Sequence, residues 1–166
     1  MTVSSQTPDS QTPDSQTPAS KITSELQRLV DVIAQLRNPN GGCPWDLAQT
    51  PDSLTPYVIE EAYEVVDAIK HGTPQDVEEE LGDLWLQVVL QAQIFTEQGA
   101  FDLGDIAKGI ADKMVRRHPH VFGNAIATSP AAVNKNWDEI KAAEKAEKGE
   151  TDSNKLSPKL REYSES

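Results

Sequence analysis

Two pairs of acidic residues recur with the same spacing in neighbouring segments of the chain. Glu61 and Glu64 are three residues apart, and Glu80 and Asp83 repeat this spacing nineteen residues later. Residues at i and i+3 lie on the same side of an α-helix, so each pair can present two carboxylates together. Mg²⁺ and Mn²⁺ prefer oxygen ligands, and the set contains none of the His or Cys ligands typical of Zn²⁺. The pattern favours a four-carboxylate site for Mg²⁺, with Mn²⁺ as a substitute; ordinary solvated acids are the other interpretation.

The segments that carry these acids have the periodicity of amphipathic helices. Apolar residues stand at the same offsets from Glu61 and from Glu80, which predicts that each helix packs through one apolar stripe. If the helices run antiparallel, the four carboxylates converge at the border of the contact. Two carboxylates about 4 Å apart repel by about 4 kcal/mol at an effective dielectric of about 20, so they must spread into solvent, take up protons or bind a cation. The stripes are Val58, Ala62, Val65 and Ile69, and Val77, Leu81, Leu84 and Val88.

The rest of the chain also indicates helices. Helical periodicity bounded by Pro, Gly and Asn predicts helices, and no segment alternates in the manner of a strand. We expect an all-α fold, an antiparallel bundle of about four to five helices that is completed by dimerisation. The Pro-rich QTPDS repeats predict a disordered tail at 1–20, before a helical domain at 21–149 and a polar, disordered tail at 150–166. The predicted helices cover residues 21–37, 55–71, 74–98, 102–117 and 130–148, with a loop at 43–53.

Composition argues against several classes of partner. The 166-residue chain carries a formal net charge of −12, whereas nucleic acids and anionic membranes select basic surfaces. No run of about 18 apolar residues predicts a transmembrane helix, and the N-terminus lacks the features of a secretory signal. The single cysteine, Cys43, cannot form an internal disulfide and suits a reducing compartment. We therefore expect a cytoplasmic protein that binds neither nucleic acid nor membrane.

The densest group of cations in this acidic chain lies at the end of the predicted helix 102–117. Lys113 and Arg117 are at i and i+4 and share a helix face, while Arg116 is rotated away. These cations can complement the helix dipole, or they can hold phosphate oxygens, for which arginine offers a bidentate fork. Trp137 and Lys141 share a face of the last helix by the same spacing. The tryptophan can pack in a core or stack on a base.

Further motifs join these residues into a wider pattern. They are Leu36-Arg37, Gly42-Cys-Pro-Trp-Asp46, Pro56-Tyr57, Glu60-Glu61-x-x-Glu64, Glu80-Leu-Gly-Asp83, Lys113, Arg116-Arg-His-Pro-His-Val-Phe122, and Trp137 with Lys141. Over roughly residues 24–148 the pattern resembles the MazG family of all-α nucleoside triphosphate pyrophosphohydrolases, in a single-domain form. The resemblance implies a hydrolase that uses Mg²⁺ to split nucleoside triphosphates into monophosphate and pyrophosphate, by attack of a metal-activated water on the α-phosphorus.

Carried over by position, the resemblance implies a role for each candidate residue. The metal ligands would be Glu61, Glu64, Glu80 and Asp83. The acid Glu60 would act beside them, either as an acceptor for a proton from water or as a support for the ligands, and a solvated glutamate is the other interpretation. Phosphate and nucleotide contacts would come from Lys113, Arg116, Arg117, Trp137 and Lys141, with Lys113 and Arg117 also offsetting charge during catalysis.

The resemblance leaves the substrate and the assembly open. Several relatives carry two such domains, and many have His where this chain has Pro51. A shallow two-helix seam predicts that a second subunit completes the site, in a dimer or a tetramer. The functional alternatives are a narrow dUTP, dCTP or phosphoribosyl-ATP pyrophosphatase, and a helical interaction protein that binds a cation only for structure. Housekeeping of the nucleotide pool and alarmone-linked regulation are both roles that the resemblance implies.

Overall fold

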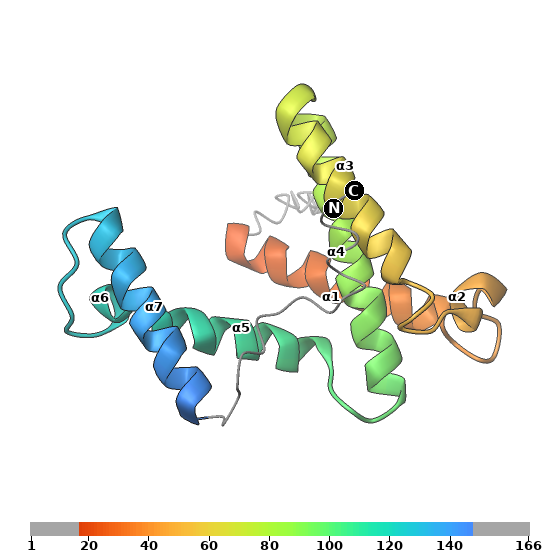
Figure 1. Cartoon of the computed structure of the whole chain (residues 1–166). Helices are drawn as coiled ribbons and strands as arrows, with labels where there is room; N and C mark the ends of the chain where they lie inside the picture. The colour runs from red at the N-terminus through yellow and green to blue at the C-terminus, as the bar shows by residue number, and fades with distance from the viewer. Residues whose placement is uncertain (1–16, 148–166) are drawn as a thin grey trace, which may run out of the picture. The chain divides into compact units, whose positions relative to one another are not determined.

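The computed structural model describes residues 17–147, and all regular secondary structure within them is helical (Figure 1). This confirms the predicted all-α class. The chain divides into two compact units, Met1–Leu103 and Gly104–Ser166, and each is described by itself. The helices are α1 (Pro18–Leu36), α2 (Pro44–Ala48), α3 (Thr55–His71), α4 (Pro74–Glu97), α5 (Leu103–Arg117), α6 (Pro119–Phe122) and α7 (Pro130–Glu147).

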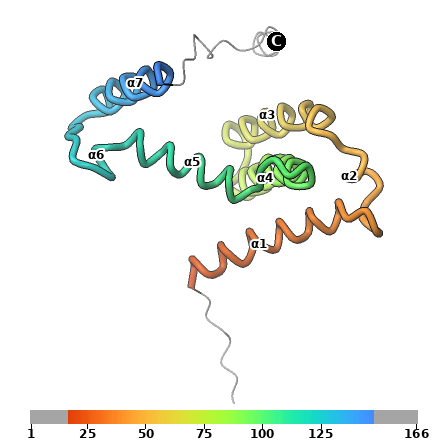
Figure 2. Tube along the Cα trace, turned by 90° about the horizontal axis from the view of Figure 1, so that it is seen from below, coloured from red at the N-terminus to blue at the C-terminus, as the bar shows by residue number. Residues whose placement is uncertain are grey.

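In the first unit, α3 and α4 form a helical hairpin and lie side by side (Figure 2). The turn between them is tight: a Cβ added at Gly72 would lie 2.8 Å from the carbonyl oxygen of Ala68. A capping box then starts α4, because the Thr73 N–H donates to Asp76 Oδ2 at 2.6 Å and the Asp76 N–H donates to Thr73 Oγ1 at 3.3 Å. This short turn makes the helices antiparallel and sets the acids of α3 opposite those of α4.

The core of the first unit lies between α1 and the C-terminal half of α4. Its most deeply buried member is Leu54, which is fully buried directly before α3 begins. Burial of a leucine side chain contributes about 1.5–3 kcal/mol, so Leu54 anchors the start of α3 to the rest of the unit. The buried cluster consists of Ile33, Leu54, Val89, Leu90 and Ile94.

A buried arginine fixes the segment that leads into α3. Arg37, at the end of α1, is 7% exposed and forms a two-point ion pair with Glu97 at the end of α4, with an Nη2–Oε2 distance of 2.7 Å. The same guanidinium donates to the backbone carbonyl oxygens of Asp46 and Gln49. One side chain therefore joins α1, α4 and the segment between α1 and α3.

The predicted apolar stripes are only partly buried, so this part of the prediction is wrong. Val65 is buried, but Val58 lies at the surface, Ile69 is 64% exposed and Leu81 is 49% exposed. The reason is that α4 turns its most buried residues toward α1, while α3 packs mainly against α4. Within the unit, part of each stripe has no neighbouring helix to cover it.

The main differences from the predicted helices are one earlier start and two additional short helices. α1 begins at Pro18, because Thr17 Oγ1 accepts a hydrogen bond from the Ser20 N–H, so the predicted tail at 1–20 is wrong for its last three residues. Single-turn helices, α2 and α6, begin at Pro44 and Pro119 in segments predicted as irregular, since proline suits the first helical turn. Residues 1–16 and 148–166 lie outside the described part, so disorder there stays a prediction.

The second unit is described over residues 104–147 and carries α5, α6 and α7. Its described residues include none classed as buried, so it has no dry core of its own in this part of the chain. No helix within residues 17–147 is both long and apolar enough to cross a membrane.

Candidate functional site

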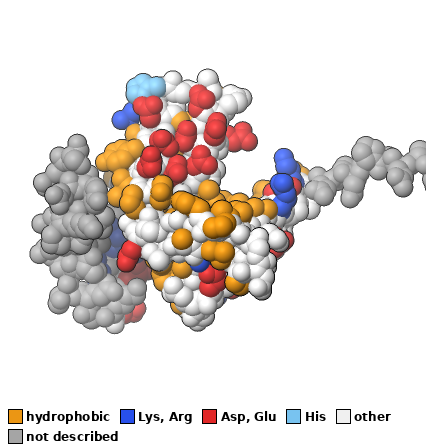
Figure 3. All heavy atoms as spheres, turned by 90° about the vertical axis from the view of Figure 1, so that its right-hand side faces the viewer, with side chains coloured by type: hydrophobic (Ala, Val, Ile, Leu, Met, Phe, Trp, Pro, Cys, Tyr) orange, Lys and Arg blue, Asp and Glu red, His pale blue; other side chains and the backbone are white. Residues whose placement is uncertain are grey.

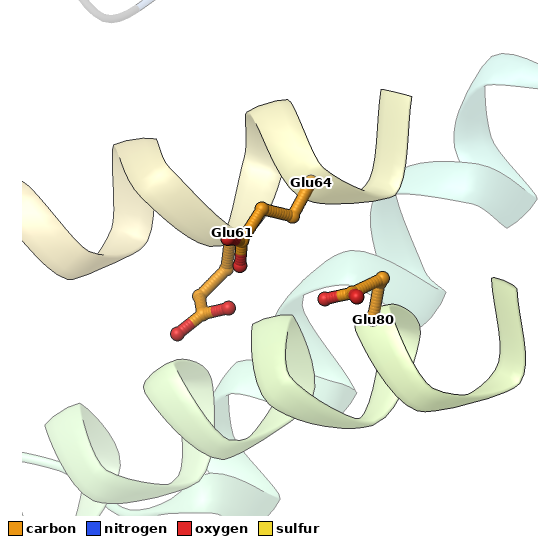
Figure 4. Close-up of side chains that lie close together, drawn as sticks. All are labelled: Glu61, Glu64 and Glu80. Carbon is orange, nitrogen blue, oxygen red and sulfur yellow. The ribbon is translucent and has the colours of Figure 1, made fainter. Parts of the chain in front are cut away.

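Three of the four predicted metal ligands meet between α3 and α4. Glu61 and Glu64 project from α3, and Glu80 projects toward them from α4 (Figure 4). One carboxylate oxygen of each residue lies within 4.8 Å of the others. The antiparallel hairpin produces this arrangement because it places the i, i+3 pair of one helix against the acids of the other.

The carboxylates disturb one another's protonation. Partial burial raises the pKa of Glu61, and the nearby charges of Asp83 and Glu64 and a hydrogen bond to Glu64 raise it further. Partial burial likewise raises the pKa of Glu80, with the charges of Glu64 and Asp83 adding to the effect. A proton or a cation relieves this repulsion. Carboxylate oxygens held this close together are donors that fit a hard divalent cation.

The other two acids of the predicted site, Asp83 and Glu60, are outside this group of three. Asp83 is not among the three carboxylates that satisfy the spacing, although its charge acts on both Glu61 and Glu80. Its side chain is one methylene shorter than that of glutamate. Glu60 is exposed, and its charge is the smallest of the causes that raise the pKa of Glu61.

The cluster belongs to a broader acidic surface. Figure 3 shows Asp and Glu side chains gathered over the α3–α4 hairpin, with hydrophobic side chains beside them. An approaching polyanion would be repelled by this surface, because the chain's acids outnumber its basic residues by 27 to 15. A ligand rich in phosphate can bind here only with cations that neutralise the contact.

In the second unit, one carboxylate joins the two predicted arginines. Glu144 Oε2 accepts hydrogen bonds from Arg117 Nε at 3.1 Å and Nη2 at 2.7 Å, and Glu144 Oε1 accepts from Arg116 Nε at 3.2 Å. The bonds from Arg117, followed by those from Arg116, lower the pKa of Glu144. The last turn of α5 is thereby tied to α7.

Trp137 and Lys141 lie on the same helix as this carboxylate. The Arg117 guanidinium stacks over the Trp137 ring at 5.3 Å from its centroid, and the His118 ring meets the same indole edge-on at 5.0 Å. Lys141 pairs with the exposed Asp138 at 3.0 Å. Lys113, one turn before Arg117 on α5, is half-buried. The structure therefore brings Arg116, Arg117 and Trp137 together within the second unit.

Sequence reasoning missed Glu144 as a partner of the arginines. The sequence did contain a signal that Glu144 belongs to this site. Its spacing of three residues from Lys141, which is four residues from Trp137, puts all three side chains on one face of α7. The interpretation of that face as nucleotide-binding considered only its aromatic and basic members. The buried ion pair of Arg37 with Glu97 was also missed, since its members are sixty residues apart.

Comparison with known proteins connects these features to one family. Residues 49–122, which include all three clustered glutamates and both arginines, match the MazG nucleotide pyrophosphohydrolase domain. The chain is 45% identical over 127 residues to the nucleoside triphosphate pyrophosphohydrolase of Escherichia coli strain K12, a match that covers 76% of this chain and 48% of that protein. It is also 45% identical over 132 residues to the nucleoside triphosphate pyrophosphohydrolase/pyrophosphatase MazG of Thermotoga maritima, covering 80% of this chain and 50% of the relative.

A solved structure supports the same assignment. The crystal structure of a mazG-related protein from Thermotoga maritima aligns with a TM-score of 0.58 and 28% identity, over 70% of this chain and 98% of that one. The chain spans about half the length of the two curated relatives named above. The resemblance drawn from the sequence motifs is thereby confirmed over residues 49–122, which match the MazG nucleotide pyrophosphohydrolase domain.

Proposed function

We propose that the protein hydrolyses nucleoside triphosphates to nucleoside monophosphate and pyrophosphate with Mg²⁺, for which Mn²⁺ can substitute. The observation that carries the proposal is the meeting of Glu61 and Glu64 with Glu80 inside a segment that matches the MazG domain. The names of the relatives supply the reaction type. Housekeeping of the nucleotide pool and alarmone-linked regulation are two physiological roles compatible with this chemistry.

The acidic cluster would hold the metal. Glu61, Glu64 and Glu80 offer oxygen ligands, and Asp83, whose charge acts on Glu61 and Glu80, would join them. When bound, Mg²⁺ supplies charge neutralisation and polarisation of a phosphoryl oxygen. Glu60, exposed beside the cluster, would accept a proton from water or support the ligands. Water would attack the α-phosphorus, the bond from the α-phosphorus to the bridging oxygen would break, and pyrophosphate would leave.

The basic residues of the second unit would bind the phosphate and nucleotide groups. Arginine forks match phosphate oxygens in geometry and charge, and Arg116 and Arg117 already hold an anion, the Glu144 carboxylate. Lys113 and Lys141 would add point charges that offset negative charge on the leaving pyrophosphate. Trp137, stacked on Arg117, would help to form the nucleotide site.

We further propose that the protein works as a homo-oligomer, a dimer or a tetramer. Hydrophobic side chains that α1, α3 and α4 leave exposed support this, and a second copy of the same helices would cover them. An apolar groove of about 520 Å³ lies over α1 and α4, with Trp85 in its wall. Sedimentation of the full chain measures the assembly. Among the exposed residues are Ile22, Leu26, Ile69, Leu81 and Trp85.

Pyrophosphate release from a panel of nucleotides tests the function. We expect turnover of several nucleoside triphosphates with Mg²⁺, and loss of turnover without loss of helical content in Glu61→Gln. Glu78→Gln is the matched control, because it makes the same chemical change at an exposed position of α4. Turnover of dUTP, dCTP or phosphoribosyl-ATP alone would favour a narrow pyrophosphatase. No release from any nucleotide would favour an interaction protein whose cation is structural.

A further inference from the structure

Two guanidinium groups converge on a single carboxylate in the second unit. Glu144 bridges them with one oxygen toward each arginine, so one negative charge faces two positive charges. The three side chains alone keep an excess of one positive charge, while the charge of Arg116 also acts on Asp112, which is itself paired with Lys108. Lys113 lies one helical turn away from Arg117 on α5. An anion with more than one charge would satisfy this pair of arginines better than a carboxylate does.

The arrangement also allows the carboxylate to leave. The side chains of Glu144 and Arg116 are 21% and 56% exposed, so water already reaches the ion pairs. Glutamate can withdraw by rotation about its own side-chain bonds. Arg117 would stay in place meanwhile, because Trp137 supports the face of its guanidinium at 5.3 Å. The two arginines therefore form a site from which one anion can be exchanged for another.

We propose that Glu144 is an internal anion that occupies the Arg116–Arg117 fork and yields it to the phosphoanhydride group of a ligand. Glu144 then sets the affinity and the charge selectivity of this fork, because each ligand must displace it. The identification of that group with the diphosphate end of a nucleotide rests on the proposed function, whereas the exchange itself does not. A purely structural role for Glu144, as a tie between α5 and α7, is the competing explanation.

Binding of inorganic pyrophosphate to the full chain tests the proposal without catalysis. Titration calorimetry is done at low ionic strength with a chelator present, so that metal at the acidic cluster makes no contribution. Glu144→Gln keeps the length and hydrogen-bonding capacity of the side chain but removes the competing charge. We expect it to tighten pyrophosphate binding by roughly three- to tenfold, the range for loss of a partly screened ion pair. Circular dichroism confirms that the variant is folded.

Two further variants separate the effect of direct contact with the arginines from the effect of a general change in charge. Glu139→Gln makes the same charge change on the same helix, at an exposed residue that is 3.9 Å from Lys135, and should leave pyrophosphate binding unchanged. Glu144→Asp keeps the charge but is one methylene too short to bridge both arginines, and should bind pyrophosphate more tightly than the wild type.

The outcomes distinguish this proposal from the proposed function. Weaker or unchanged pyrophosphate binding in Glu144→Gln would overturn the exchange and favour the structural tie, as would tightening of equal size in Glu139→Gln. Absence of binding in both the wild type and Glu144→Gln would also overturn it. If the protein hydrolyses no nucleotide but Glu144→Gln tightens pyrophosphate binding, the proposed anion site is supported and the proposed reaction is refuted.

Discussion

The replacement Glu97→Gln would leave the guanidinium of Arg37 buried without its counter-charge. Arg37 is nearly enclosed, with a side chain that is 6% exposed, whereas the Glu97 side chain is 35% exposed. Removing one partner of a fully buried pair costs about 3–5 kcal/mol, and an exposed pair contributes about 0–1 kcal/mol. Arg37 would retain its bonds to the carbonyls of Asp46 and Gln49. We therefore expect a loss of about 1–3 kcal/mol in the free energy of unfolding.

Urea denaturation followed by far-ultraviolet circular dichroism measures this loss. For a protein of this size, the slope of free energy with urea is about 1–3 kcal/mol per molar, so the midpoint should fall by roughly 1 M. Glu25→Gln is the matched control, since it removes the same charge from an exposed ion pair with Arg28 on α1. That variant should change the free energy of unfolding by less than about 0.5 kcal/mol.

The comparison of the two variants tests whether the buried ion pair stabilises the fold. If Glu97→Gln costs no more than Glu25→Gln, the buried ion pair does not hold the end of α1 to the end of α4. The account of how the segment before α3 is fixed would then fail, because Arg37 is the side chain that joins these elements.

Two further predictions concern charge. Hydrogen bonds from Arg37 hold the pKa of Glu97 below its ordinary 4.5, so its contribution to stability is complete above that pH and disappears as the pH falls through the lowered value. The gap in urea midpoint between wild type and Glu97→Gln should therefore narrow as the pH is lowered stepwise below 4.5; a gap that stays unchanged until the wild type itself unfolds in acid would contradict the ion pair. At Glu61 the effect of the charge on stability is the opposite. Burial and neighbouring acids raise the pKa of Glu61, so its charge destabilises the metal-free fold at neutral pH. Glu61→Gln should raise the thermal midpoint in chelator, while saturating Mg²⁺ should stabilise the wild type more than the variant; a lower midpoint in chelator would refute the assignment.

The sequence predicted the meeting of the acidic helices because the signals for it are local. The i, i+3 acids, the capped turn at Thr73 and the helical periodicity each depend on a few neighbouring residues, and the hairpin follows from them. Asp83 shows the limit of this reasoning. A helical wheel gives the direction of a side chain, but it does not give the distance from that carboxylate to the acids of the facing helix, and Asp83 is outside the group of three.

The parts that the sequence did not predict depend on contacts between distant elements. The apolar stripe of α3 had the correct period, yet Ile69 is exposed because α3 packs mainly against α4 and Ile69 lies outside that contact. Glu144 lies on the predicted face of α7, but its contacts with Arg116 and Arg117 require α5 and α7 to approach. Periodicity identifies the faces of helices, and tertiary packing selects their partners.

Binding of Mn²⁺ to the full chain is the most direct test of the acidic cluster. Electron paramagnetic resonance of free Mn²⁺ reports binding without any nucleotide or turnover. We expect saturable binding in the wild type and in Glu78→Gln, with strong loss in Glu61→Gln and in Glu80→Gln, since these two residues come from the facing helices α3 and α4. Equal Mn²⁺ affinity in the wild type and Glu80→Gln, or no saturable binding in the wild type, would contradict a metal site between α3 and α4.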